Sequence, residues 1–243
     1  MESNKPTLHY MQNSGSQQSL WLLEELGIEY DLVLHERPGR APAALKETHP
    51  LGKSPQLVTA SGRTIAERSA IALYLIETYD KEGRFKVPTP EQDPDWNSKD
   101  NDKFREEQLF SIGNTTLDSL INMKTTLAVF ANHTPFFIWP ILLGVKYTLD
   151  TMFLNTEIDN YFKFLDAELE GREYFNGTKN PTRLDFVMQW YVDLAAQSAR
   201  VDLSSYPRIK AWFDRCISRP AWKRALEKGN GYDLEFWKMK MTS

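Results

Sequence analysis

Two hydrophobic periods alternate along the first third of the chain. Residues 7–11 form a short β-prone run after a proline, which predicts a first strand. Apolar residues at helical spacing follow over 20–26, and Gly27 ends this pattern as a helix C-terminal cap would. From 29 to 35 apolar residues recur at every second position, so this stretch predicts a second strand.

Proline and glycine punctuate the next segment. A short helix is predicted over 42–48, with a proline in its first turn, and the Pro- and Gly-rich stretch 49–55 predicts a loop. Residues 56–60 and 63–66 flank a Ser-Gly pair and predict a hairpin, and helical spacing returns over 69–79. This order predicts a small α/β unit with helices packed on a mixed sheet. The arrangement is thioredoxin-like, but no Cys-x-x-Cys is present, which excludes dithiol redox chemistry.

The pattern changes after residue 84. Residues 85–99 are rich in Pro, Asp and Glu without a sustained period, which predicts a linker between one domain at 1–84 and another at 100–243. The second domain shows no convincing strand pair, so its predicted class is all-α. Its predicted helices cover 104–125, 148–169, 182–199, a stretch around 209–216, and 221–228.

Two details support this helical reading. Thr182 stands three residues before Asp185, the spacing of a capping box in its Asp variant, and this predicts a helix start. Cys216 shares an apolar helix face with Ile209 and Trp212, which predicts an inert core thiol.

Composition and charge narrow the classes of function. The chain has 243 residues, 41% of them hydrophobic, which suffices for packed cores and excludes disorder as the main state. A formal net charge of −4 with interleaved signs leaves no basic stripe, so nucleic acid is not an expected partner. No secretory signal is visible, and the single cysteine excludes an internal disulfide. The longest apolar run, 135–145, is too short to span a bilayer and is predicted to be broken by Pro140. These features predict a cytoplasmic protein.

Three segments occur in a distinctive order and spacing: 8–14 leading into 20–27, then 49–57, then 65–75. Together they resemble the glutathione transferase superfamily, especially its fungal and bacterial members. The resemblance implies a thioredoxin-like domain that holds the tripeptide glutathione as co-substrate, and an all-helical domain that supplies much of the second-substrate pocket. It also implies a homodimer.

Such chemistry needs a thiolate. A thiol with a pKa near 8.5 is only about 3% ionised at pH 7, and lowering the pKa by roughly two units requires about 2.7 kcal/mol. A hydroxyl hydrogen bond to a charged group contributes roughly 1.5–3 kcal/mol and a helix N-terminus roughly 0.3–2 kcal/mol. These two contributions suffice together, so no metal is needed.

Ser14 lies between the first strand and the first helix, and it matches the family's active-site serine. The alternative is that Ser14 only caps the helix, a common use of serine. Asn13, Ser16 and Tyr10 are rivals in the same loop, although Tyr10 is expected to face the core.

The resemblance also implies the residues that bind glutathione. Ser54-Pro55 looks like the family's cis-proline turn, whose backbone pairs with the cysteinyl part as a strand would. Lys53 suits the glycine carboxylate, with His49 as a second donor; a solvated surface role is the alternative for both. Glu67 is placed to hold the γ-glutamyl ammonium.

At the start of the third predicted helix, the N–H groups of Arg68 and Ser69 would meet the γ-glutamyl carboxylate. The sequence departs from the family here, because the residue after the glutamate is usually serine. The Arg68 guanidinium either strengthens carboxylate binding or points to solvent. Gly15 and Gln18 likewise replace arginines that are common after the active-site serine.

Three functions remain open from the sequence. The leading one is conjugation, in which Ser14 stabilises a thiolate that attacks an apolar electrophile. The second uses the same site for glutathione-dependent isomerisation or elimination, and the third is a non-catalytic relative that carries ligands. An aromatic-rich stretch comprises Phe130, Phe136, Phe137, Trp139 and Ile141. It either lies near the second-substrate pocket or packs in the core, and core packing is the expectation for each individual residue.

Overall fold

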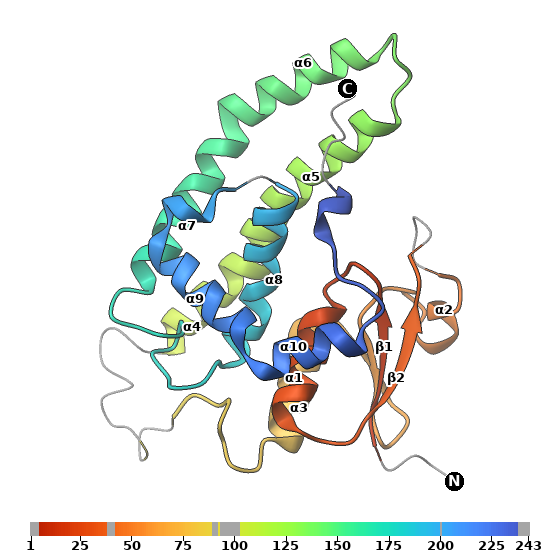
Figure 1. The fold of residues 1–243 in the computed structure, drawn as a ribbon, viewed down its shortest axis with the longest axis vertical. Coiled ribbons are helices and arrows are strands. Elements are labelled where there is room, and N and C mark those ends of the chain that lie inside the picture. The colour runs from red at the N-terminus through yellow and green to blue at the C-terminus, as the bar shows by residue number, and fades with distance from the viewer. Residues whose placement is uncertain (1–4, 38–41, 89–91, 93–102, 200, 238–243) are drawn as a thin grey trace.

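A computed structural model describes residues 5–37, 42–88, 92, 103–199 and 201–237. A small sheet with its helices occupies one side of the molecule, and a larger helical region forms the remainder (Figure 1). Most of the predicted linker, 85–99, lies outside the described residues. Its first residue, Phe85, is buried edge-on against Phe186, so the chain leaves the first domain in contact with the second.

The sheet has four strands in the order β2-β1-β3-β4. β1 (Thr7–Met11) pairs in parallel with β2 (Asp31–His35) and antiparallel with β3 (Gln56–Val58), which pairs antiparallel with β4 (Thr64–Ala66). The mixed sheet and the hairpin predicted from the sequence are therefore confirmed, with shorter strands in the hairpin.

Three helices complete the N-terminal domain: α1 (Ser16–Leu26), α2 (Leu45–Thr48) and α3 (Arg68–Tyr79). α1 ends where Gly27 takes the left-handed conformation, with φ 66°, and donates its N–H to the Leu23 carbonyl at 3.1 Å. α2 is shorter than predicted, because residues 43 and 44 form a turn before it. α1 is the most enclosed of the three, and its Trp21 is fully buried.

The helical region follows the predicted all-α class within the described residues. Its elements are α4 (Lys103–Ser111), the π-helix η1 (Ile112–Leu117), α5 (Asp118–His133), α6 (Trp139–Leu149), the π-helix η2 (Asp150–Leu154), α7 (Asn155–Glu168), α8 (Arg183–Gln197), the 3₁₀ helix η3 (Leu203–Ser205), α9 (Pro207–Ser218), α10 (Pro220–Lys228) and the 3₁₀ helix η4 (Leu234–Trp237).

Two helical runs are longer than the sequence predicts. α4, η1 and α5 run on to His133 rather than ending near Thr125, and α6, η2 and α7 begin at Trp139 rather than near Thr148. Pro140 sits in the first turn of α6, where its missing N–H has no partner to lose, so it starts a helix instead of interrupting the apolar run. The two runs form a long hairpin that extends past the other helices (Figure 1).

A buried carboxylate fixes the start of α8. The predicted capping box is present, and Asp185 accepts hydrogen bonds from the Thr182 backbone N–H at 2.8 Å and its hydroxyl at 2.9 Å. Asp185 also accepts from the Phe175 N–H at 3.0 Å and from the Trp212 indole at 2.9 Å. Burial raises the pKa of Asp185, and these four donors oppose that rise. One side chain therefore joins α8, the preceding loop and α9.

We predict that Asp185→Asn lowers the free energy of unfolding by about 3 kcal/mol, because at least two charge-assisted hydrogen bonds lose their acceptor. Urea unfolding followed by circular dichroism measures the change. Asp214→Asn is the matched control, since Asp214 is an exposed carboxylate on α9 that pairs with Lys210. Its effect should stay within about 0.5 kcal/mol, and equal effects of the two substitutions would contradict the role of Asp185.

Two histidines stack between β1 and β2. The rings of His9 and His35 lie 5.3 Å apart at 19°, and His9 Nδ1 is 3.1 Å from His35 Nε2. Burial lowers the pKa of both imidazoles, and the charge of His35 lowers that of His9 further. The folded state therefore favours a neutral pair in which one ring donates and the other accepts.

This pair predicts a loss of stability in mild acid. Because both folded pKa values lie below the unfolded value of about 6.5, the contribution is complete above that pH and is lost as the pH falls through the folded values. Thermal unfolding measured between about pH 7.5 and pH 5 should show this decline, and His35→Gln should flatten it. A variant with the same pH slope as the wild type would refute the assignment.

Candidate functional site

Three serine hydroxyls connect the start of α1 to the turn before β3. Ser14 Oγ lies 2.9 Å from Ser16 Oγ, which lies 2.6 Å from Ser54 Oγ. The Met11 N–H also donates to Ser16 Oγ at 3.1 Å, so the chain of hydroxyls is tied to the end of β1. The structure thus brings together Ser14 and Ser54, which the sequence analysis assigned to one site.

Ser14 itself is turned inward. It is only 4% exposed, its hydroxyl donates to the Met11 carbonyl at 2.6 Å, and its oxygen accepts the Ser16 N–H at 3.2 Å. The Ser14 oxygen thus accepts the first N–H of α1, although the N-cap residue of this helix is Gly15, which has no side chain to cap it. A donor role toward a ligand requires the hydroxyl to rotate away from the Met11 carbonyl.

The rivals of Ser14 have other partners. The side-chain oxygen of Asn13 accepts the Asp233 N–H at 2.7 Å, and the Tyr10 hydroxyl is buried and donates to Gln17 at 2.9 Å. Tyr10 faces the core as predicted. Ser16 is fully buried between the two other serines. Tyr10 is therefore excluded by its place in the core, and Ser14 stays the candidate that the resemblance favours.

The loop before β3 has the expected shape. The Ser54–Pro55 peptide bond is cis, as predicted, and Ser54 is half-buried. Lys53 is exposed, and within the described residues its ammonium makes no hydrogen bond or ion pair. Nδ1 of His49 accepts the Leu51 N–H at 3.3 Å, so this ring supports the turn and has Nε2 left to contact a ligand.

Glu67 has an unusual backbone conformation. It precedes α3 with φ 72° and ψ 124°, a region that side chains other than glycine rarely adopt, and such residues cluster at functional sites. Its carboxylate is exposed and forms no hydrogen bond or ion pair with any described residue. The first helical bond of α3 runs from the Ile71 N–H to the Glu67 carbonyl, so the N–H groups of Arg68 and Ser69 have no partner within the helix.

Arg68 does not point to solvent. Its guanidinium carbon lies 4.9 Å from the Trp190 ring centroid and 5.0 Å from that of Tyr191. A terminal N–H of the guanidinium donates to the Tyr191 hydroxyl at 3.0 Å. The alternative in which the Arg68 guanidinium points to solvent is therefore wrong. Burial raises the pKa of Tyr191, and the charge of Arg68 opposes that rise.

Gln18 is directed away from the three serines and into the domain interface. Its amide donates to Gln189 on α8 and, at 3.1 Å, to the Tyr232 hydroxyl. Tyr232 in turn donates to the buried Asp193 at 2.7 Å. This departure from the family pattern therefore affects how the domains are joined and does not remove a residue from the site.

A pocket of about 340 Å³ lies between the domains. Arg37 forms one side and donates to the Asn13 carbonyl at 2.9 Å, and Trp190 forms another, so both walls adjoin the turn that carries Ser14. Burial lowers the pKa of Arg37. The remaining lining residues come from α5 and α8: Asn122, Thr125, Thr126, Val129, Phe130 and Leu194. A larger hollow, about 540 Å³, is lined by α4, η1 and α7 alone.

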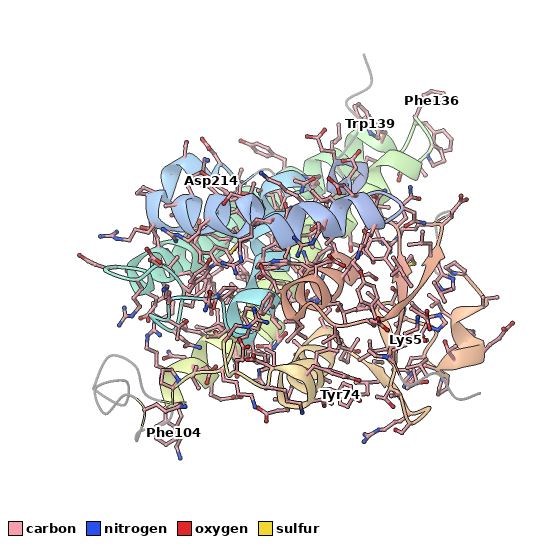
Figure 2. All side chains as sticks on the ribbon, turned by 60° about the horizontal axis from the view of Figure 1, so that its bottom comes forward. Lys5, Tyr74, Phe104, Phe136, Trp139 and Asp214 are labelled. Carbon is pink, nitrogen blue, oxygen red and sulfur yellow. The ribbon has the colours of Figure 1, made fainter. Side chains whose placement is uncertain are left out.

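The expectation of core packing for the aromatic-rich stretch is wrong. Phe130, Phe137 and Ile141 are largely exposed, and Phe136 is 87% exposed. Phe130 lines the pocket beside Arg37, whereas Phe136 and Trp139 lie at the outer edge of the molecule (Figure 2). The long hairpin of helices explains this placement, because it lifts these residues away from the core (Figure 1).

Sequence reasoning missed several residues of this region. Arg37, Trp190 and Tyr191 were not assigned to the site, and Ser16 was only a rival for the role of Ser14. No local signal marks these side chains, because each acts through a contact with a distant segment. In contrast, the burial of Cys216 was predicted; burial raises the pKa of its thiol well above the usual value.

Within the described ranges, no three His, Cys, Asp or Glu side chains are placed to hold a metal ion. No helix in the same part of the chain combines the length and apolar character needed to cross a membrane.

Known proteins resemble this chain over both domains. The family model described as glutathione S-transferase, N-terminal domain, matches residues 15–78, and that for the C-terminal domain matches 140–220. A curated relative, glutathione S-transferase 3 of Schizosaccharomyces pombe, is 32% identical over 222 residues, covering 91% of this chain and 86% of the relative.

Solved structures with the same fold are also similar. A glutathione S-transferase from Actinobacillus pleuropneumoniae has a TM-score of 0.68 at 26% identity, covering 98% of this chain and 97% of its own. A sphingomonad glutathione S-transferase complexed with glutathione has a TM-score of 0.64 at 21% identity, covering 91% and 97%.

Proposed function

This chain belongs to the glutathione S-transferase family, and we propose that it activates the thiol of glutathione for attack on an apolar electrophile. One observation carries the proposal. Segments far apart in the sequence meet at one place: the N-terminus of α1 with Ser14, the turn at Ser54–Pro55, and Glu67 before α3. The hydroxyl chain joins the first two, and the side chain of Arg68 joins the first and third.

The site offers a partner for each charged part of glutathione. The exposed ammonium of Lys53 suits the glycine carboxylate, with His49 beside it. The backbone of Ser54, which leads into β3, suits the cysteinyl part as an added strand would. The carboxylate of Glu67 suits the γ-glutamyl ammonium, and the N–H groups of Arg68 and Ser69 suit its carboxylate. In support of this frame, the sphingomonad structure of the same fold holds glutathione.

Thiolate formation uses the N-terminus of α1. No acidic side chain stands in the first turn of this helix, so its partial positive charge is available to an anion. When the Ser14 hydroxyl leaves the Met11 carbonyl, it donates to the thiolate sulfur, and the thiol proton passes to solvent. The thiolate then attacks an electrophilic carbon and forms a C–S bond. A leaving group departs with the bonding electron pair, or the acceptor takes up a proton.

The pocket beside the turn supports the second half of the reaction. Half of its lining residues are aromatic or aliphatic and suit an apolar electrophile, and the other half, Arg37 and three polar residues of α5, can contact polar groups on it. A homodimer and a cytoplasmic location, both expected from the sequence and its resemblance, remain predictions.

We predict that Ser14→Ala raises the pKa of the bound thiol by about 1–2 units, the effect of losing one hydroxyl donor to a charged group. Turnover of a generic electrophile at pH 7 should fall about tenfold or more. Titration of the thiolate's ultraviolet absorbance measures the first change. Ser218→Ala is the control, because this hydroxyl also donates to a backbone carbonyl but lies at the end of α9.

The same experiment separates the competing functions. A non-catalytic relative would give a Ser14→Ala variant that matches the wild type in every assay. Substrate turnover without net loss of glutathione would show isomerisation instead of conjugation. A raised thiol pKa together with stoichiometric loss of glutathione is the expected result.

We predict that Glu67→Gln weakens glutathione binding about tenfold while leaving the pKa of the bound thiol unchanged, because the charge lost faces the ammonium and not the sulfur. Isothermal titration calorimetry measures the affinity. Glu47→Gln serves as the control, since Glu47 is an exposed carboxylate on α2. A Glu67→Gln variant with wild-type affinity would remove Glu67 from the site.

A further inference from the structure

Gly15 leaves room for a neighbouring side chain, and its own backbone does not call for glycine. Its φ of −63° and ψ of 6° are open to any residue. A Cβ added at this position would lie 2.5 Å from both Cδ and one terminal nitrogen of Arg68. The arginine therefore occupies the space that a side chain at position 15 would fill.

Arg68 is fixed from the other domain. Its guanidinium packs against the Trp190 and Tyr191 rings of α8 and donates to the Tyr191 hydroxyl at 3.0 Å. Tyr191 donates in turn to Asn114 at 2.7 Å, which holds its hydroxyl in place. The charge of Arg68 also acts on Asp118 at the start of α5, where it opposes the rise in pKa that burial causes.

We propose that Arg68 is a positioning residue, which sets the turn of Ser14 and Gly15 by filling the space over Gly15 from an anchor on the helical domain. This role rests on the proposed glutathione site, and it bears on how glutathione is bound there. Arg68 spans the N-termini of α1 and α3, the two helix ends that would meet the thiolate and the γ-glutamyl carboxylate.

The departures from the family pattern at positions 15 and 68 are then linked, because the space lost at one position is filled from the other. In the family pattern that the sequence resembles, arginine stands where this chain has Gly15, and serine stands where it has Arg68. With Arg68 in its observed position, a Cβ at residue 15 would force the arginine side chain to shift from its anchor on α8. The helical domain thereby gains a contact with the start of α1 through a side chain of α3.

The planar group of Arg68 is essential to this role. A guanidinium can pack against two aromatic rings and donate to a fixed hydroxyl at the same time, whereas an ammonium is a compact charge on a flexible stem. Arg68→Lys should therefore behave like Arg68→Ser in glutathione affinity. A Lys variant with wild-type affinity would show that charge alone suffices, which overturns the proposal.

A double-mutant cycle with Gly15→Ala, Arg68→Ser and the combined variant tests this link. Glutathione affinity is measured by calorimetry, and the thermal midpoint is measured without glutathione. Gly144→Ala is the control for the added methyl group, since a Cβ there meets nothing within 4 Å. Arg63→Ser is the control for the lost arginine, since Arg63 is exposed on the β3–β4 hairpin.

Each single variant should weaken glutathione binding about tenfold, a loss of about 1.4 kcal/mol, which residues in direct contact commonly show. The double variant should bind no worse than Arg68→Ser alone, because the added methyl group no longer meets the arginine. The thermal midpoint should fall when Gly15→Ala is made in the wild type. It should not fall further when Gly15→Ala is added to Arg68→Ser.

Losses in affinity that multiply in the double variant would overturn the proposal. Coupling in the thermal midpoint without coupling in affinity would also overturn it, since the pair would then be purely structural. If the wild type itself does not bind glutathione, the proposed function fails as well. Additive losses in a chain that binds glutathione refute the positioning role alone.

Discussion

The buried carboxylate of Asp185 is the contact on which the rest of the structure depends. Its four donors fix where α8 begins and in which direction it runs. The next two turns of α8 then meet the N-terminal domain: Phe186 packs on Trp21, Gln189 bonds Gln18, and Tyr191 holds Arg68. A capping box far from the site in sequence therefore sets the position of one wall of the site.

The two ends of α1 are built in opposite ways. At its C-terminal end, Glu24 pairs with Arg224 and Lys228 of α10, and Glu25 pairs with Arg219. Carboxylates near a helix C-terminus are unfavourable, and these cations offset that repulsion while they fasten α10 to α1. At the N-terminal end, neutral serine hydroxyls and the Arg68 guanidinium adjoin the first turn, which carries no carboxylate. The positive end of the helix is thus kept for a ligand.

Local patterns predicted most of the fold but only part of the site. Periodicity, Gly27 as a cap and the Thr182–Asp185 box each act within a few residues, so they could be read from the sequence. The inward rotation of Ser14 and the contact of Ser16 with Ser54 depend on segments that meet only in the folded chain. Pro140 was misread because a proline interrupts a helix or starts one according to where the first turn falls.

The substitutions around α1 change where positive charge stands relative to the sulfur. Arginines at positions 15 and 18 would place two charges on α1 itself. Here Gln18 joins a network with Gln189 and Tyr232, which donates to the buried Asp193; burial raises the pKa of that carboxyl. Gly15 leaves its space to Arg68. The start of α1 therefore has no arginine of its own, and the guanidinium of Arg68 on α3 lies there instead. Because the rings of α8 hold this guanidinium, the helical domain determines its position.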